Sequence, residues 1–283
     1  MRRKSLNPLA RLGAGFAGLC CLFGLWAWAS GHQPAYVLPS PADTWRALVT
    51  MAGTGTLWGP LGVTLWRALL GLGLACFIGI GWGSLSAASQ VFDAFTRSWL
   101  SLLMAVPPIV IVVIGMLALG PTAGVVLLVV VLVSVPLITT STRDAISQVD
   151  PDLLEMAHAF DRGPAWRGRH VIGPAVVPPV LSAVTVAAGQ SLRVCVMAEL
   201  LSTSTGLGAR MQMARTAINT DQVFALAVVL AAFSLLVELV VLAPVRSRVN
   251  RAQRDAAPAP AACSLSPPHT IRFIRFPSKE MHQ

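Results

Sequence analysis

Residues that could act as acids, bases or metal ligands gather in one stretch of the sequence, EMAHAFDRGPAWRGRHVIGP at positions 155 to 174. Glu155, His158 and Asp161 carry the atoms that general acid–base catalysis or a bound metal ion would use. No Ser or Cys nucleophile has a fitting position beside them, and His170 completes neither an HExxH motif nor a similar spacing. The stretch therefore predicts neither a catalytic centre nor a metal site, and we expect no enzyme activity and no cofactor in this chain.

Arg193 is a charged residue deep inside an apolar run, where a charge is costly and faces a cavity or a partner. Two interpretations stay open, because Arg193 could attract an anionic substrate in a translocation pathway or bond backbone carbonyls at a helix crossing. Glu199 follows six residues later, about 240° around a helix, so the two side chains do not share a face. We expect Glu199 to lie at the outer mouth of the same pathway.

The composition indicates the class of protein that holds these residues. Of 283 residues, 55% are hydrophobic and only 12% are charged, roughly half the charge of a soluble domain. The apolar residues come in blocks, which is typical of a polytopic helical membrane protein. The net charge of +9 would indicate nucleic acid in a soluble protein. In a membrane protein basic residues mark the cytoplasmic side, so we expect membrane lipid and no nucleic acid as a partner.

Six apolar runs predict an all-α membrane protein with six transmembrane helices. Their approximate bounds are 9–29, 62–87, 98–118, 122–141, 176–198 and 223–243. The third run holds Val-Pro-Pro at 106 to 108, which a membrane helix tolerates when neighbours satisfy the freed backbone groups. Of the 21 Lys and Arg residues, sixteen fall on one side of this arrangement and four on the other. The positive-inside rule then places both termini and the loop 142–173 in the cytoplasm.

The ends of the chain complete this domain organisation. We expect a cytoplasmic N-terminus at 1–8, a transmembrane domain at 9–245 and a disordered cytoplasmic tail at 246–283, which is rich in Pro, Ala and Ser. The first apolar run could be a signal peptide, but it is longer than the usual hydrophobic region, so we interpret it as an uncleaved span. On the outer side, residues 38–51 predict a short helix with Ser40 as its N-cap.

The polar loop begins with a predicted amphipathic helix. Asp150 can cap it, and Pro151 fits its first turn without losing a hydrogen bond. Leu153, Ala157 and Phe160 then fall on one face at spacings of four and three residues. We therefore expect an apolar face on the cytoplasmic surface, and exposed apolar patches of this kind mark partner surfaces.

A second short helix should follow a turn at Gly163 and Pro164. It carries Trp166, and we expect Pro174 to end it, because a proline biases the preceding residue, Gly173, away from helical backbone. The whole loop is then a helix, turn, helix elbow with an apolar side and a charged rim.

At this point the sequence resembles a known family. The elbow is similar to the EAA loop of permease subunits of bacterial ATP-binding-cassette importers, a pattern that begins Glu-Ala-Ala, has Gly four residues after the second Ala and ends in Leu-Pro. Glu155, Ala157 and Pro174 match its positions. Asp161 stands where the family has Gly, and Gly173 stands where it has Leu, so we expect Gly163 and its proline to supply the turn instead. Segments 37–48, 104–110 and 198–214 resemble the branch that imports nitrate, sulfonates and taurine.

The resemblance implies a type I importer permease fold in the bacterial inner membrane. Two permease subunits would form the pathway, in the homodimer that we expect or in a heterodimer, and an extracytoplasmic binding protein would deliver a small anion. A separate ATPase subunit would use ATP and Mg, and this chain indeed contains no GxxxxGK[ST] phosphate-binding motif. The implied ATPase-coupling residues are Leu153, Glu155, Ala157, Phe160, Asp161, Gly163, Trp166 and Pro174. A secondary transporter that works without an ATPase is the alternative.

Overall fold

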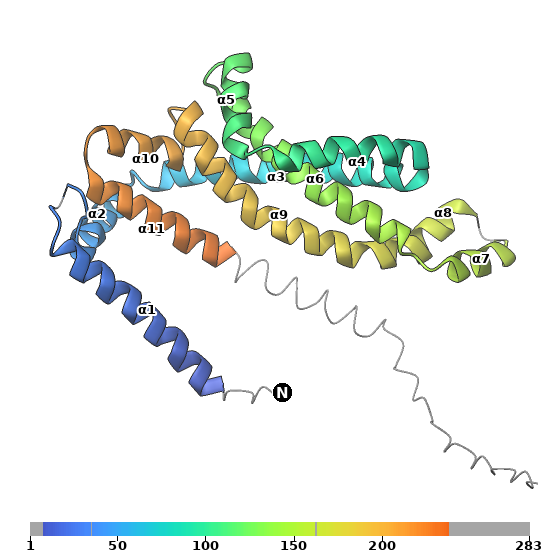
Figure 1. Ribbon diagram of the computed structural model, residues 1–283, viewed down its shortest axis with the longest axis horizontal. Helices are drawn as coiled ribbons and strands as arrows, with labels where there is room; N and C mark the ends of the chain where they lie inside the picture. Colours follow the sequence, from blue (N-terminus) through green and yellow to red (C-terminus); the bar gives the residue numbers. More distant parts are fainter. Residues whose placement is uncertain (1–7, 35, 162, 238–283) are drawn as a thin grey trace, which may run out of the picture.

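The computed structural model describes residues 8–34, 36–161 and 163–237, and the regular elements of these ranges are helices. The predicted tail and the first seven residues lie outside the described residues. The helices are α1 (Pro8–Ser30), α2 (Pro41–Gly53), α3 (Trp58–Ala88), α4 (Gln90–Ala105), α5 (Pro108–Leu119), α6 (Ala123–Ser147), α7 (Pro151–Ala159), α8 (Pro164–Arg167), the π-helical turn η1 (Gly168–Ile172), α9 (Gly173–Ser202), α10 (Leu207–Thr216) and α11 (Thr220–Val237). The molecule is elongated, with α7 and α8 near one end and α2 and α10 near the other (Figure 1).

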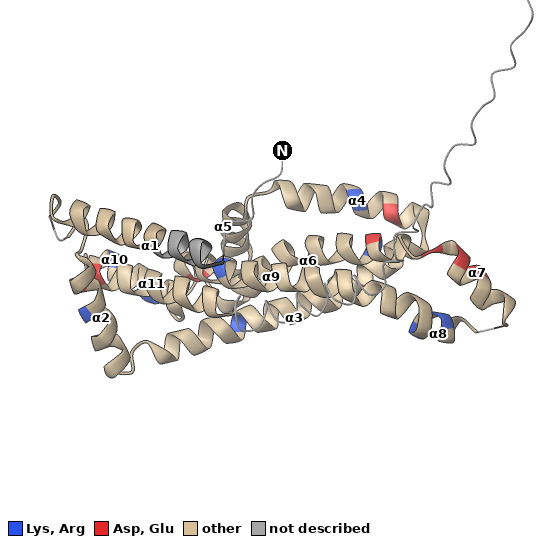
Figure 2. Cartoon of the chain, turned by 90° about the horizontal axis from the view of Figure 1, so that it is seen from below, with Lys and Arg blue, Asp and Glu red and all other residues tan. Residues whose placement is uncertain are grey.

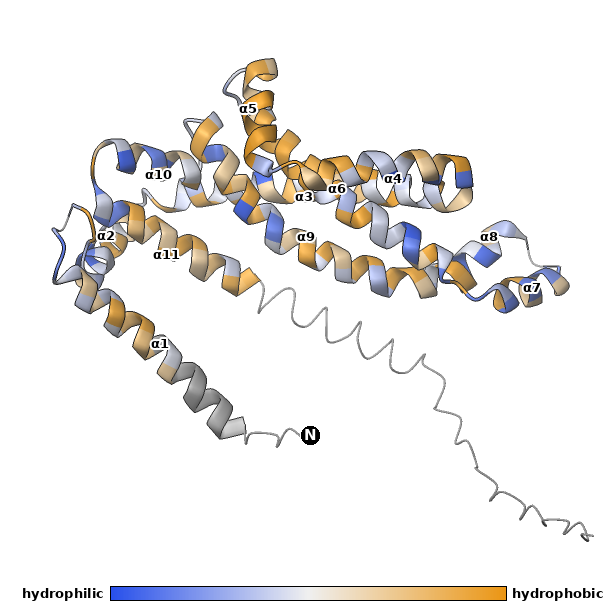
Figure 3. Ribbon diagram, viewed as in Figure 1, coloured by the Kyte–Doolittle hydropathy of each residue, from blue (hydrophilic) through white to orange (hydrophobic). Residues whose placement is uncertain are grey.

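Four helical segments of the described ranges are long and apolar enough to cross a membrane. They are α3, α6, the unbroken helical segment from α8 to α9, and α11, and they match four of the six predicted spans. In Figure 3 hydrophobic residues dominate α5 and α11, whereas α2, α7, α8 and α10 carry more hydrophilic ones. Figure 2 shows charged residues on α2 and α10 near one end and on α4, α7 and α8 near the other, with a few between them. Charged residues are therefore concentrated toward the two ends of the molecule.

The predicted span 98–118 is wrong as a single helix. The structure breaks it into α4 and α5, which meet at an angle of 96°. Val106 and Pro107 have extended backbone, with ψ angles of 123° and 137°. Two consecutive prolines remove two backbone donors and disfavour helix at the preceding residue, so the helix ends there. α4 also begins earlier than expected, at Gln90, where the Ser89 side chain accepts a hydrogen bond from the Phe92 N–H.

Helices α3 and α6 lie parallel and unusually close. Gly71, Gly79 and Gly83 of α3 face α6, and each partner residue on α6 lies 59 positions further along the chain. A Cβ atom on Gly79 would come within 2.9 Å of Cβ of Ile138. With the buried Ala75 between them, these glycines repeat every four residues, which allows two membrane helices to approach closely. Gly73 and Gly81, which share the run, have open space around them.

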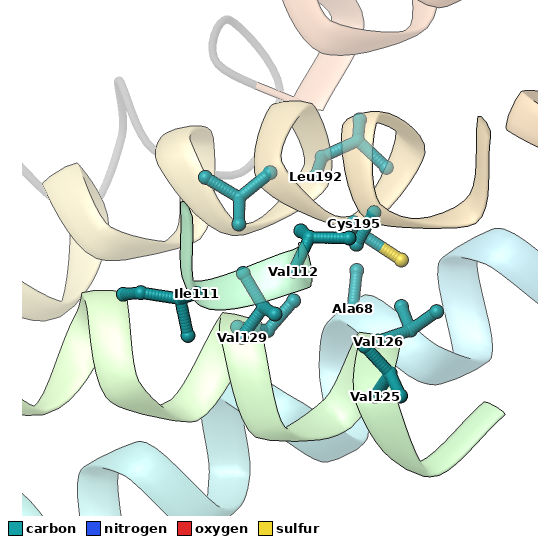
Figure 4. Packing of buried hydrophobic residues seen from close by; sticks show 11 residues of the cluster. Ala68, Ile111, Val112, Val125, Val126, Val129, Leu192 and Cys195 are labelled. Atoms are coloured by element: carbon teal, nitrogen blue, oxygen red, sulfur yellow. The ribbon is translucent and has the colours of Figure 1, made fainter. Parts of the chain in front are cut away.

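An aliphatic core fills the middle of the bundle (Figure 4). Buried side chains from α3, α5, α6 and α9 meet there, and they are mainly valines. They include Ala68, Ile111, Val112, Val125, Val126, Val129, Leu192 and Cys195. The turn between α4 and α5 therefore has a packing function. It directs α5 away from the axis of α4, so that Ile111 and Val112 pack against this core.

A polar cluster ties α4 to its neighbours near the α7–α8 end. Asp93 of α4 accepts a hydrogen bond from the Ser86 hydroxyl of α3 at 2.9 Å. The same carboxylate pairs with Arg97 at 2.7 Å and with Arg143 of α6 at 3.4 Å. Arg143 also pairs with Asp144 at 2.6 Å, so this end of three helices is cross-linked by charge-assisted bonds.

Candidate functional site

The elbow predicted from the sequence is present at the end of the molecule. The Asp150 carboxylate accepts a hydrogen bond from the Asp152 N–H at 2.9 Å, which confirms the predicted N-cap of α7. α7 ends at Ala159, and after a turn α8 begins at Pro164 with extended Gly163 as its cap. The two short helices therefore form a helix, turn, helix unit, as the sequence indicated.

The turn after α7 is made by Asp161, not by Gly163. Asp161 has a φ of 52°, the left-handed region that favours glycine and that Asp tolerates better than most residues. Its N–H donates to the carbonyl of His158 at 2.9 Å, which closes the end of α7. The expectation that the turn had moved to Gly163 is wrong, because an aspartate adopts here the conformation for which a glycine is best suited.

The second correction concerns Pro174, which does not end the second helix. Helical backbone continues without a break from Pro164 to Ser202, over 39 residues. The π turn η1 makes this possible: the Gly173 N–H reaches back five residues to the carbonyl of Gly168. The wider turn accommodates the Pro174 ring, which an ordinary helical turn would force against the preceding backbone. We call residues 164–202 the rod, and it joins the elbow directly to α9.

An apolar groove of about 500 Å³ lies between the two arms of the elbow. Its lining residues are Leu153, Met156, Ala157, Phe160, Trp166, His170 and Val171. The structure thus brings together four apolar residues that the sequence predicted for this surface: Leu153, Ala157, Phe160 and Trp166. It adds three lining residues that the sequence analysis did not predict there: Met156, His170 and Val171. Met156 lies beside the predicted face of α7, and His170 stacks on Trp166 with ring centroids 4.7 Å apart. A search for apolar and aromatic neighbours four residues from Trp166 could have found His170.

The outer part of this groove is solvent-accessible apolar surface. Phe160 is 70% exposed and Leu153 is 46% exposed, whereas Ala157 at the base is buried. Glu155 is exposed on the rim of α7. Such a patch on a polar end of the molecule can bury an apolar side chain of another protein, with charged groups around it.

A buried ion pair joins α3, α9 and the segment before α10. Arg67 Nη1 lies 2.8 Å from Glu199 Oε1, and the Glu199 side chain is fully buried. Thr64 donates from its hydroxyl to the other carboxylate oxygen at 2.7 Å. Arg67 also donates to the Thr205 carbonyl at 2.8 Å and to its hydroxyl at the same distance. We call Thr64, Arg67, Glu199 and Thr205 the polar knot, and both oxygens of the buried Glu199 carboxylate accept hydrogen bonds in it, as burial requires.

Glycine is needed where the chain folds over the polar knot. Gly206 has a φ of 112°, and a Cβ atom there would collide with the Glu199 carboxylate. A Cβ on Gly208 would collide with the Val196 carbonyl, and the Gly208 N–H donates to Glu199 at 3.3 Å. The sequence placed Glu199 at an outer mouth, whereas here it is enclosed. Arg67 was missed as a site residue, although it too lies inside an apolar run, which is the signal that identified Arg193.

Arg193 lies on a different face of α9 from Glu199 and is exposed. Its Nε donates to the Gly189 carbonyl at 3.2 Å, one turn back along the same helix. In the part of the chain that the structure describes, Arg193 forms no ion pair, and Glu199 pairs with Arg67 instead. The structure therefore separates the two pathway candidates into one buried and one exposed group.

These features define a class: a helical membrane protein with an exposed apolar elbow joined by the rod to its membrane core. The family described as the inner membrane component of binding-protein-dependent transport systems matches residues 79–248. The chain belongs to this family, and it is an inner-membrane protein.

Relatives of known name agree with this assignment. An ABC transporter permease protein of Brucella melitensis is 28% identical over 190 residues, which cover 67% of this chain and 77% of the relative. SsuC of Escherichia coli, described as an aliphatic sulfonates transport permease protein, is 26% identical over 71% of this chain and 78% of its own length. The taurine transport system permease protein TauC of Escherichia coli is 27% identical over 71% of this chain and 75% of its own length.

Solved structures share the fold. A chain of an amino acid ABC transporter crystallised with histidines has a TM-score of 0.59 at 18% identity, covering 72% of this chain and 98% of that one. A chain of the MetNI methionine ABC transporter has a TM-score of 0.54 at 16% identity, covering 67% and 92%. The fold is therefore that of ABC importer permease structures.

Proposed function

We propose that this chain is the permease subunit of an ATP-driven importer and forms the pathway for a small anion such as nitrate, a sulfonate or taurine. The observation that carries the coupling part of this function is the apolar groove of the elbow, with exposed Leu153 and Phe160 on its edges. With these exposed apolar side chains, α7 would fit into a groove on a separate ATPase subunit. The anion follows from Arg193 and from the names of the sulfonate and taurine relatives.

The proposed topology has six spans, with both termini and the elbow in the cytoplasm. Two arrangements support it. In Figure 1 the described starting end of α1 and finishing end of α11 both point away from the α2–α10 end. Helices α4 and α5 together are long and apolar enough for one further, bent span, and α1 is helical over the first predicted span. The basic residues of the sequence then orient the elbow inward.

ATP and Mg would be used by the partner ATPase, whose closure would push on the elbow. The rod would carry that displacement into the membrane, because residues 164–202 are one helical body. A second copy of this chain would complete the pathway, and an extracytoplasmic binding protein would deliver the substrate. Glu155 and the basic residues around the elbow would make the polar contacts at the edge of the ATPase.

A photo-crosslinking experiment tests the docking. We would place a benzophenone amino acid at Phe160 in the elbow and, as a control, at Trp45 in α2, which is 65% exposed at the other end. Membranes of the source bacterium are irradiated, and the crosslinked proteins are identified. We expect Phe160 to capture a protein that contains a P-loop and hydrolyses ATP, and Trp45 not to. Capture of no such ATPase at Phe160 would contradict the proposal.

Substitution of Ala157 tests coupling. Ala157 is buried at the base of the groove, so Ala157→Asp would place an unpaired carboxylate in the contact, at a cost of a few kcal/mol (about 2 to 5). We expect uptake to fall more than about tenfold while the chain remains in the membrane. Glu155→Lys should also uncouple ATP hydrolysis from uptake. Uptake at the normal rate by both variants would refute the role of the elbow.

A further inference from the structure

One face of α9 carries three polar residues and one valine along the membrane part of the molecule. Ser182, Val186, Gln190 and Arg193 are spaced by four, four and three residues, so they share one helical face. Gln190 and Arg193 are exposed, Ser182 is half-buried, and Val186 is 43% exposed. We call these four residues the α9 lane. From Ser182 to Arg193 it extends about 16 Å along the helix axis.

The α9 lane continues toward the elbow into a groove that polar and apolar residues line together. This groove, of about 430 Å³, lies between α6 and α9 and includes Ser182 and Val186. On the α6 side its polar residues are Thr140, Ser141, Asp144 and Gln148. The negative charge of Asp144 is already compensated by Arg143 at 2.6 Å. Polar groups interspersed with apolar ones therefore extend from the middle of α9 toward the elbow end, and Arg193 supplies their uncompensated charge.

The direction of the Arg193 side chain argues against snorkelling of its guanidinium to the membrane surface. Its Nε bonds to the carbonyl of Gly189, on the elbow side of Arg193, so the guanidinium is held toward the middle of α9. A guanidinium and an amide that face lipid in this position cost several kcal/mol each, and such groups face a water-filled cavity instead. The lane is thus poorly suited to contact acyl chains.

We propose that the α9 lane is the wall of the aqueous pathway that selects anions, with Arg193 and Gln190 as its selecting residues. The guanidinium presents donors in a fixed fork that fits the oxygens of a sulfonate, nitrate or similar oxyanion. The Gln190 amide, one turn away, adds a neutral donor. Ser182 and the groove between α6 and α9 then provide polar contacts for the onward path. This inference rests on the proposed function, because it assigns a substrate class to the pathway of the importer.

Accessibility of introduced cysteines tests the lane without requiring transport. In a background with the native cysteines replaced by alanine, Gln190→Cys and Val186→Cys are made in the full-length chain in native membranes. Each is reacted with the anionic sulfonatoethyl and the cationic trimethylammonioethyl methanethiosulfonate, and rates are normalised to those of free mercaptoethanol. Phe77→Cys is the matched control, because Phe77 of α3 is 83% exposed, has Leu74 and Ile80 three residues to either side and should face lipid.

We expect both lane cysteines to react and the Phe77→Cys control not to. At Gln190→Cys the anionic reagent should be favoured about threefold or more, since a unit charge about 6 Å away changes the local ion concentration by that factor even in water. Arg193→Leu should abolish the preference, and Arg193→Lys should keep it. Unreactive cysteines at both lane positions, or a reactive Gln190→Cys whose preference is unchanged by Arg193→Leu, would overturn the inference.

These outcomes are separable from those of the proposed function. If the lane behaves as expected but the elbow captures no ATPase, the lane stands and ATP-driven coupling fails. If the ATPase is captured but the lane cysteines are unreactive, the importer stands and the pathway lies elsewhere.

Discussion

Replacing Glu199 with glutamine would remove the negative charge of the polar knot while keeping nearly the same shape. The amide oxygen can still accept from Thr64, but the Arg67 guanidinium, only 12% exposed, loses its counter-charge. Removing one partner of a buried ion pair typically costs about 3 to 5 kcal/mol. Arg67 keeps two hydrogen bonds to Thr205, so we expect the lower end of that range, about 3 kcal/mol less free energy of unfolding.

The measurement is a titration of the detergent-solubilised chain with sodium dodecyl sulfate, followed by tryptophan fluorescence. Arg67→Met alone should also destabilise, whereas the double variant with Glu199→Gln should lose about 2 kcal/mol less than the sum of the two single losses. Glu155→Gln, which changes an exposed carboxylate on α7, is the control and should stay within about 0.5 kcal/mol. Additive losses in the double variant, or no loss for Glu199→Gln, would refute the coupling of these charges.

Three further substitutions test particular contacts. Gly79→Val should prevent stable assembly of α3 on α6, because its Cβ would lie 2.9 Å from that of Ile138, whereas Gly81→Ala has open space and should be neutral in the same detergent unfolding assay. Asp161→Gly should keep or raise the protease resistance of the elbow, since the φ of 52° suits glycine, and Asp161→Val should lower it. Asp150→Ala should loosen α7 by about 1 kcal/mol, seen as faster hydrogen exchange of its first turn with unchanged exchange in α6.

Local sequence rules predicted the ends and faces of the helices well where only neighbouring residues decide them. Ser40 caps α2 with its hydroxyl accepting from the Asp43 N–H, and Asp150 caps α7, both as expected. The same rules failed at Pro174, because a π turn can accommodate a proline that an ordinary helical turn would reject. They also failed at Asp161, because Asp can adopt either left-handed or right-handed backbone and its residue type does not decide between them.

Contacts between distant segments could not be predicted from the sequence, for a different reason. The glycine-rich run of α3 indicated close helix contact, but only the rotation of the helix separates Gly79, which touches α6, from Gly81, which does not. The pairing of Arg67 with Glu199 depends on the register of two helices, and neither charge identifies the other from spacing alone. The exposed position of Arg193 likewise follows from how α9 packs, not from its own residues.

The separation of the two charges of the polar knot has a consequence for biosynthesis. Arg67 and Glu199 are 132 residues apart, so at about 5 to 20 residues per second the ribosome delivers the glutamate about 7 to 26 s after the arginine. During that interval α3 must reside at the insertion machinery or in the bilayer with an unpaired guanidinium, a penalty of about 3 kcal/mol or less on insertion scales. The apolar residues of the 31-residue helix α3 can offset that penalty by their own favourable insertion free energy. When α9 is inserted, the ion pair with Glu199 then stabilises a helix that is already in the membrane.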